Sequence, residues 1–191
     1  MKKQAQPLHK KSENSPEDMA LEMEREVNGI IEEAVVALQK GDPTLALEKA
    51  KLAQKKERLL NKFREEKNHT EQNVDLTFAV TFTLGKVYHA NLMFTEALDT
   101  YTAIVKNKNY QNAGRIRVNM GNIYFEQKKY NYAIKNYRMA LDQIMPASHN
   151  EMRNKILKNI GIAFLKLGQY SDAAQNFEQI VDNANNCVQT A

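Results

Sequence analysis

From residue 16 onward, apolar residues recur at intervals of three and four, the spacing of one face of an α-helix. The apolar positions of the first such segment are Leu21, Val27, Ile30, Ile31, Ala34 and Leu38. Ser15 and Pro16 precede it as a cap and a first helical residue, and the run 41–43 (Gly-Asp-Pro) ends it and begins another helix. We therefore expect helices from 16 to about 40 and from 43 to about 67, after a disordered polar tail over residues 1–15.

Beyond residue 75, the pattern of apolar and small positions repeats three times. The units are counted from Gly85, Gly121 and Gly161, which lie 36 and 40 residues apart. An apolar residue directly precedes each glycine, and an aromatic residue lies three positions after the glycine. An alanine lies twelve positions after the glycine. Two more aromatic residues flank this alanine, one three positions before it and one four positions after it. These columns are Leu84, Met120 and Ile160; Tyr88, Tyr124 and Phe164; Ala97, Ala133 and Ala173; Phe94, Tyr130 and Tyr170; and Tyr101, Tyr137 and Phe177.

Such columns predict an all-α solenoid of stacked helical hairpins. Two antiparallel helices cross closely only where small residues meet, so we expect each glycine to face the alanine of its own unit, with the aromatics packed beside the crossing. A hairpin of this kind cannot bury its apolar face alone, and stacking on its neighbours completes the core. The intervals between units are longer than the ~34 residues of an ideal repeat. We expect the extra residues to lie in two loops, around residues 106–113 and 143–150.

A degenerate first unit precedes these three. Its second helix carries Ala46, Ala50 and Ala53 at the alanine, aromatic and following small positions, and Ala34 and Ala37 replace the glycine and aromatic of its first helix. The predicted division is a disordered tail over 1–15, a degenerate hairpin with an extended second helix over 16–76, three repeats over 77–184 and a polar tail over 185–191. The last hairpin is expected to end near residues 181–182.

The columns match the tetratricopeptide pattern, and three segments give a closer resemblance. They read NYQNAGRIRVNMGNIYFEQKKY over 109–130, YRMALDQI over 137–144 and GQYSDAA over 168–174. The chain resembles the N-terminal repeats of the polaris family, the large tetratricopeptide subunit of intraflagellar transport complex B, strongly over 75–182 and more weakly over 18–74. Members of this family are several times longer. The resemblance implies a tetratricopeptide fold and a protein-binding scaffold that joins other complex B subunits in cilium assembly, in the cytoplasm and at the cilium and basal body.

Composition excludes several other classes. The 27 basic and 23 acidic residues give a net charge of +4 and are interspersed, whereas a nucleic-acid site would need a concentrated basic patch. No run approaches the ~18 apolar residues of a membrane span. Cys187 is the single cysteine, and the four histidines are scattered without metal-ligand spacing. We therefore expect no catalysis, no cofactor and no metal.

The inner helices of such a solenoid line a concave groove. Counting from the glycines gives the candidate groove residues Phe82, Lys86, His89, Arg115, Val118, Asn122, Phe125, Lys155, Lys158, Ile162 and Leu165. This mixed basic and apolar strip suits an extended or helical segment that carries acids and apolar anchors, although part of it could instead pack against further repeats. An alternative function is a cytosolic co-chaperone-type adaptor. The carboxylate clamp of such adaptors requires lysine and asparagine at the positions where this chain has Phe82 and Lys86. This difference counts against the co-chaperone alternative.

Two surface features remain. A basic stripe on the extended second helix consists of Lys51, Lys55, Arg58 and Lys62. It either attracts an acidic protein surface or is a solvated face with local acid partners such as Glu48. At the other end of the chain, Phe177 and Ile180 of the last hairpin are expected to form an apolar edge, through which the chain self-associates or binds a partner.

Overall fold

The computed structural model of the protein describes residues 15–67, 73–107, 110, 113–144 and 150–189, the last six of them as backbone only. Within these ranges the regular elements are helices. They are α1 (Pro16–Gln39), α2 (Pro43–Glu66), α3 (Val74–Ala90), α4 (Phe94–Lys106), α5 (Gly114–Glu126), α6 (Tyr130–Gln143), α7 (Asn150–Lys166) and α8 (Tyr170–Gln189). The predicted all-α fold is confirmed. Of the tail expected to be disordered, all but Ser15 lies outside the described residues.

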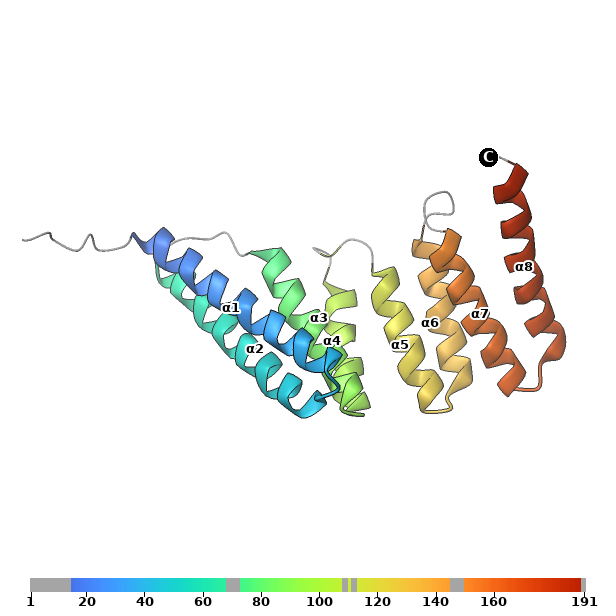
Figure 1. Ribbon diagram of the computed structural model, residues 1–191, viewed down its shortest axis with the longest axis horizontal. Helices are drawn as coiled ribbons and strands as arrows, with labels where there is room; N and C mark the ends of the chain where they lie inside the picture. Colours follow the sequence, from blue (N-terminus) through green and yellow to red (C-terminus); the bar gives the residue numbers. More distant parts are fainter. Residues whose placement is uncertain (1–14, 68–72, 108–109, 111–112, 145–149, 190–191) are drawn as a thin grey trace, which may run out of the picture.

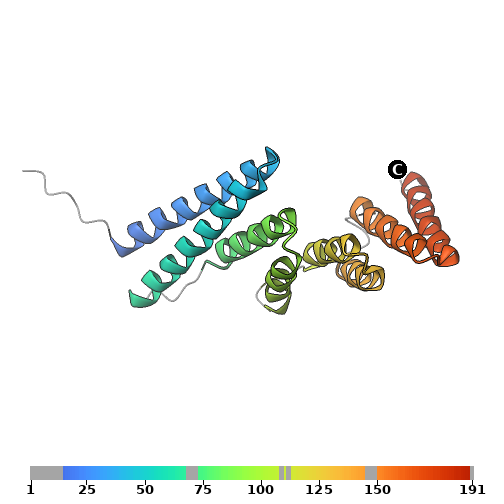
Figure 2. The ribbon, with the colours of Figure 1, turned by 90° about the horizontal axis from the view of Figure 1, so that it is seen from below.

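Consecutive helices pair into four hairpins, which stack in chain order (Figure 1). Seen from below, the row bends into a shallow arc with α3 and α5 on its inner side and α4 and α6 on its outer side (Figure 2). The last three hairpins are joined where the sequence predicted loops, since α4 ends at Lys106 and α5 begins at Gly114, while α6 ends at Gln143 and α7 begins at Asn150. The molecule is therefore an α-solenoid with an inner and an outer face.

Short polar side chains start the first three helices. The hydroxyl of Ser15 accepts a hydrogen bond from the backbone N–H of Asp18 at 3.1 Å, and the Asp18 carboxylate accepts one from the Ser15 N–H at 3.2 Å. Asp42 and Asn73 cap α2 and α3 in the same way, through single side-chain oxygens. These bonds satisfy N–H groups that have no partner inside the helix, and they explain why the predicted start at Pro16 holds.

Each hairpin turn contains one residue in the left-handed region. Backbone N–H groups of the turn donate hydrogen bonds to the last carbonyl groups of the first helix. Gly41 (φ 80°) and Gly168 (φ 73°) occupy this position in the first and last turns, and Leu92 and Lys128 (both φ 58°) in the middle two. In the third turn, for example, the N–H of Lys129 donates to the Tyr124 carbonyl at 2.8 Å. This is the Schellman arrangement, in which glycine is usual because it has no Cβ to clash.

The expected partner of the repeat glycines is wrong. A Cβ placed on Gly121 would lie 2.6 Å from Cδ1 of Tyr137, and the same ring position covers Gly85 and Gly161, through Tyr101 and Phe177. Each glycine thus faces the aromatic four residues beyond the alanine. Side chains lean toward the N-terminus of their own helix, which for α6 is the turn, so the Tyr137 ring reaches back to the level of Gly121.

Apolar clusters join neighbouring hairpins. Ala97, Tyr101 and Ile104 of α4 pack with apolar residues of α5, and a second cluster runs from Ala133 and Tyr137 of α6 through α7 to α8. In the degenerate first unit, the alanines at the predicted repeat positions are all buried: Ala34, Ala37, Ala46, Ala50 and Ala53. All but Ala53 form a cluster with Leu84 and Val87 of α3. Two expected core positions are wrong: Leu21 is 47% exposed, and Tyr170, from the aromatic column that precedes the alanines, is 71% exposed.

The last helix is longer than expected. We predicted an end near residues 181–182, but α8 continues to Gln189, into the segment expected to be a polar tail. Once a helix exists, each further residue adds a hydrogen bond, and no glycine or proline stands between 182 and 189 to stop it. The side chain of Asn183 also donates to Asn154 of α7 at 2.9 Å, which ties this part of α8 to its hairpin partner.

Candidate protein-binding groove

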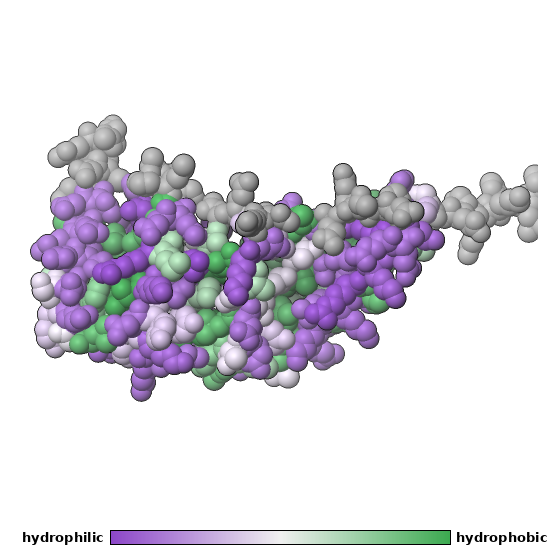
Figure 3. All heavy atoms as spheres, turned by 180° about the vertical axis from the view of Figure 1, so that it is seen from behind, coloured by the Kyte–Doolittle hydropathy of each residue, from purple (hydrophilic) through white to green (hydrophobic). Residues whose placement is uncertain are grey.

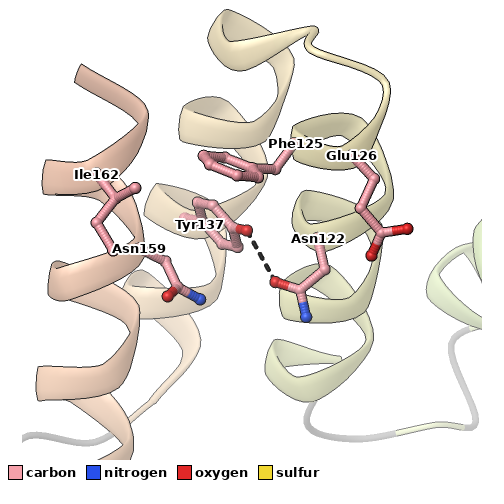
Figure 4. Close-up of a pocket in the computed structure, with 6 residues that line it drawn as sticks. All are labelled: Asn122, Phe125, Glu126, Tyr137, Asn159 and Ile162. Carbon is pink, nitrogen blue, oxygen red and sulfur yellow. Dashed lines mark hydrogen bonds between the residues drawn. The ribbon is translucent and has the colours of Figure 1, made fainter. Parts of the chain in front are cut away.

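A pocket of about 170 Å³ opens on the inner face, where α5, α6 and α7 meet (Figure 4). Its lining residues are Asn122, Phe125, Glu126, Tyr137, Asn159 and Ile162. In Figure 4 the amides of Asn122 and Asn159 come from different hairpins and lie at the same end of the pocket, while Phe125 and Ile162 stand on opposite sides. The pocket thus combines hydrogen-bonding groups with two apolar walls.

The Tyr137 hydroxyl reaches this pocket from the far side of the hairpin. It donates a hydrogen bond to Oδ1 of Asn122 at 2.8 Å, so the amide NH₂ of Asn122 points away from the tyrosine as a donor. Burial, assisted by the Glu126 carboxylate, raises the pKa of Tyr137, and the hydroxyl therefore remains a donor. Within the described part of the chain, Asn159 makes no side-chain hydrogen bond, so its amide is available to a ligand.

A second, wider pocket of about 500 Å³ continues the inner face toward the first hairpin. It is lined by Leu38, Gln39, Lys86, His89, Ala90, Leu92, Tyr101, Asn119 and Glu126. Glu126 borders both pockets, and its carboxylate lies 2.9 Å from Nε2 of His89. We refer to the two pockets together as the groove, since one side chain forms part of both walls.

The tyrosine–asparagine contact recurs in this second pocket. Here Nδ2 of Asn119 donates to the Tyr101 hydroxyl at 3.3 Å. Burial raises the pKa of Tyr101 to about 12. In both hairpins, the ring that covers the repeat glycine therefore also carries a hydroxyl to the inner face, where an asparagine holds it.

Five of the eleven sequence-predicted residues line the groove. Asn122, Phe125 and Ile162 lie in the first pocket, and Lys86 and His89 in the second. The other six line neither pocket.

Those six lie in three kinds of surroundings. Phe82 and Val118 are half-buried and pack against apolar clusters, and Phe82 stacks on Phe78 with ring centroids 5.7 Å apart. Lys155 is exposed and pairs with Glu151 at 2.6 Å. The remaining three, Arg115, Lys158 and Leu165, are exposed. The groove is consequently less basic than the sequence suggested.

Sequence reasoning missed several groove residues. Asn119 and Asn159 both stand two residues before a repeat glycine, so a column of asparagines was available in the alignment of the units. Tyr101 and Tyr137 were assigned to the core through their aromatic column. Both residues carry a hydroxyl group, which Phe177 lacks at the same position of the third unit. This polar group indicates a hydrogen-bonding role in addition to packing.

The groove is suited to binding a polypeptide segment. Asparagine amides can bond to the N–H and C=O groups of a backbone whatever its sequence, and the apolar walls can take a side chain. Among the described residues, no three histidine, cysteine, aspartate or glutamate side chains lie together as a metal site would require. Within the same ranges, no helix has the length and apolar character needed to cross a membrane.

Comparisons with known proteins agree with the repeat pattern. The tetratricopeptide repeat family model matches residues 112–186. Over 183 residues the chain is 50% identical to the protein named Intraflagellar transport protein 88 homolog from Homo sapiens, a match that covers 95% of this chain and 22% of that relative. The resemblance inferred from the sequence is thus confirmed. The chain spans about a fifth of the length of this relative.

Two solved structures are similar in shape. The crystal structure of BtubC (BKLC) from P. vanneervenii superposes with a TM-score of 0.57 at 15% identity, over 92% of this chain and 67% of that one. The crystal structure of MamA gives a TM-score of 0.49 at 16% identity, over 82% and 96% of the two chains. At this identity the first similarity concerns the fold alone.

Proposed function

Since the chain carries tetratricopeptide repeats and is a homologue of part of an intraflagellar transport protein, we propose that it is a non-catalytic, protein-binding scaffold of intraflagellar transport complex B. It would act in cilium assembly, in the cytoplasm and at the cilium and basal body. The observation that carries this proposal is the 50% identity over 95% of the chain. Repeat proteins of this kind use their extended inner surfaces for binding.

The groove is the proposed binding site, and its occupant is an extended or helical segment of another complex B subunit. Asn122 and Asn159 would hold the segment's backbone, and one of its apolar side chains would enter between Phe125 and Ile162. Lys158 and Arg115, both exposed on the helices that line the groove, would attract acidic residues that flank this anchor. Lys155 would contribute less, because Glu151 already pairs with it.

The C-terminal edge is proposed as a second contact of the same scaffold. On α8, a pocket of about 390 Å³ is lined by Ala174, Phe177, Glu178, Val181 and Asp182. The expected edge residues Phe177 and Ile180 are half-buried, and the apolar side chains that face solvent there are Ala174 and Val181, the latter 58% exposed. Through this edge the chain would self-associate or bind a partner. The predicted division into a degenerate hairpin and three repeats likewise remains a proposal.

A binding experiment with the whole chain tests the groove. Each purified complex B subunit is titrated against the immobilised chain, and the subunit that binds is retested against Asn159→Ala combined with Ile162→Ser. We expect a loss of affinity on the order of tenfold or more, because the double variant removes an apolar wall and the side-chain amide that would bond to the backbone of the bound segment. The matched control changes two exposed lysines of the outer helices, Lys106→Glu with Lys135→Glu, and should bind as the parent does.

Two outcomes would overturn the proposal. Retention of none of the complex B subunits by the folded chain would refute the scaffold assignment, and retention of acidic chaperone tails instead would support the co-chaperone alternative. Binding of a subunit that is equally strong in the groove variant would leave the scaffold in place but move the site elsewhere on the surface.

A further inference from the structure

We propose that the outer face of α2 is a further docking surface, which takes an acidic amphipathic helix of a partner protein. The inference goes beyond the groove and does not depend on it. It rests on the basic stripe that the sequence singled out and on a row of leucines beside it. Neither feature takes part in the stacking of the hairpins.

The leucine row consists of Leu45, Leu52 and Leu59, which are 41%, 38% and 49% exposed. They lie seven residues apart, just under two turns of an α-helix, so they align along one side of α2. Single exposed leucines are ordinary on a protein surface. Three in heptad register are the pattern by which one helix receives another.

Residues between the leucines complete a heptad seam. Lys49 and Lys56 lie between the leucines, and Phe63 follows the last of them, at intervals of four and three. All three are half-buried, and Phe63 also packs against the cluster that contains Leu60 and Leu76. The ammonium group of Lys49 is held by Glu33 of α1 at 2.6 Å, and Lys56 is held by Glu26 at 2.8 Å. Because their charges are engaged on the α1 side, the methylene stems of the two lysines can serve as apolar surface between the leucines.

The basic stripe flanks this seam on its other side. Lys51, Lys55, Arg58 and Lys62 are all exposed. In the part of the chain that the structure describes, only Lys62 has an acidic partner, Glu66, at 3.8 Å. The one acid between residues 51 and 62 is Glu57, which is 6% exposed and bonded inward to Thr77. The stripe is therefore a run of positive charge with no acid of its own in its central turns.

The first hairpin is long enough to display this surface without unstacking. Its helices have 24 residues each, against 13 and 17 for α4 and α3 of the next hairpin. At the end of the hairpin away from its turn, an ion pair between Glu24 and Arg64 and the buried Leu60 hold the two helices together. Its inner face packs on α3, which leaves the row and the stripe on the opposite side free for a partner.

Charge and shape together favour a protein helix over a membrane. In Figure 3 the first hairpin lies on the right, and its surface is mainly hydrophilic with small apolar areas between. A membrane-bound helix would need a broad apolar face with aromatic residues, whereas this seam is narrow and ends beside Glu48, Glu65 and Glu66, which are exposed. A partner helix with leucines over the seam and acids beside Lys51, Lys55 and Arg58 would match both features.

A titration with a synthetic helix tests the surface. The probe is a fluorescein-labelled peptide of about three heptads, with leucine at its a and d positions and glutamate beside them; a second peptide carries lysine in place of glutamate. Anisotropy is measured against the whole chain. We expect the acidic peptide to bind, more weakly at high salt, and the basic peptide to fail. Lys55→Glu with Arg58→Glu, and separately Leu52→Ser with Leu59→Ser, should each lower affinity about tenfold.

Matched controls separate this surface from others. Lys106→Glu with Lys135→Glu reverses two exposed charges of α4 and α6, and Leu165→Ser shortens a leucine of α7 that is 44% exposed; both should bind as the parent does. Circular dichroism checks that all variants fold, which is expected because the changed side chains are exposed. The proposal is overturned if the acidic peptide does not bind, or if controls and α2 variants lose affinity equally. Binding of phosphatidylserine vesicles instead of the peptide would also overturn it, as would a dimer of the parent that the leucine changes dissolve.

Discussion

Replacing two helical glycines by alanine should change stability in opposite directions. Gly29 of α1 is exposed, and a Cβ added to it would meet nothing within 4 Å. Gly121 of α5 is buried against the Tyr137 ring, whose Cδ1 and Cζ would lie 2.6 and 3.0 Å from the new methyl group. The same chemical change therefore enters open space in one helix and an occupied volume in another.

The magnitudes follow from two competing terms. Alanine stabilises a helix interior by about 0.8–1.0 kcal/mol relative to glycine, and Gly29→Ala should gain this amount. Gly121→Ala gains the same term but overpacks the crossing, which costs about 1–3 kcal/mol. The ring cannot swing away freely, because its hydroxyl bond to Asn122 would be lost at about 1 kcal/mol. The balance of these two terms predicts that Gly121→Ala destabilises the chain by up to about 2 kcal/mol.

Urea unfolding followed by circular dichroism measures both changes against the parent. A third variant joins Gly121→Ala to Tyr137→Leu, whose shorter side chain makes room for the methyl group. It should be more stable than the sum of the two single changes predicts, because the clash is gone. If Gly121→Ala raises the urea midpoint as Gly29→Ala does, the ring does not cover the glycine and the reasoning fails.

Three further predictions concern the turns, the core and pH. Lys128→Gly should stabilise the chain by about 0.5–1 kcal/mol, because the left-handed conformation costs a non-glycine residue about 1–2 kcal/mol. Gly168→Ala, in the equivalent turn, should destabilise it, and equal urea midpoints for the two variants would contradict this. Ala133→Leu, at a site with 0% exposure, should cost about 1–3 kcal/mol; an unchanged melting curve would show spare room there. The contribution of Tyr101 to stability should be constant below pH 10 and fall as pH rises toward about 12, because the unfolded chain ionises this group at its ordinary pKa of 10.0. Ultraviolet titration of tyrosinate should lose a step near pH 12 in Tyr101→Phe, and retention of that step would assign it to another residue. The pKa of Tyr137 is raised as well, so a later step should remain in this variant.

The helices and their pairing could be predicted because their signals are local. Ser15 with Pro16 and the glycines at 41 and 168 act through hydrogen bonds and backbone angles within a few residues. Leu92 and Lys128 take the same left-handed conformation as those glycines with no local sign of it. There the packing of the two helices imposes a conformation that the residue itself disfavours, and a single sequence cannot reveal that.

The groove was harder to predict than the fold, because spacing along a helix does not give the direction or reach of a side chain. Counting from the glycines found Asn122, Phe125 and Ile162, which lie one or four residues after them. The count missed Glu126, which borders both pockets, and Tyr137, which enters the groove from the outer helix. Both depend on how two helices are placed relative to one another. That relation is a property of the packed structure.

The clusters that bridge neighbouring hairpins determine how the chain responds to local damage. The cluster of α4 and α5 belongs to two hairpins at once, as does that of α6, α7 and α8. A substitution in one of these clusters therefore destabilises the helices on both sides of it, while distant hairpins respond only through the units between them. Amide exchange would then be faster in the first and last hairpins, each of which has a neighbour on one side among the described residues, and slowest in α3 to α6. A substitution in the cluster of α4 and α5 would raise the amide exchange rate in the hairpins on both sides. The increase would become smaller with each further hairpin.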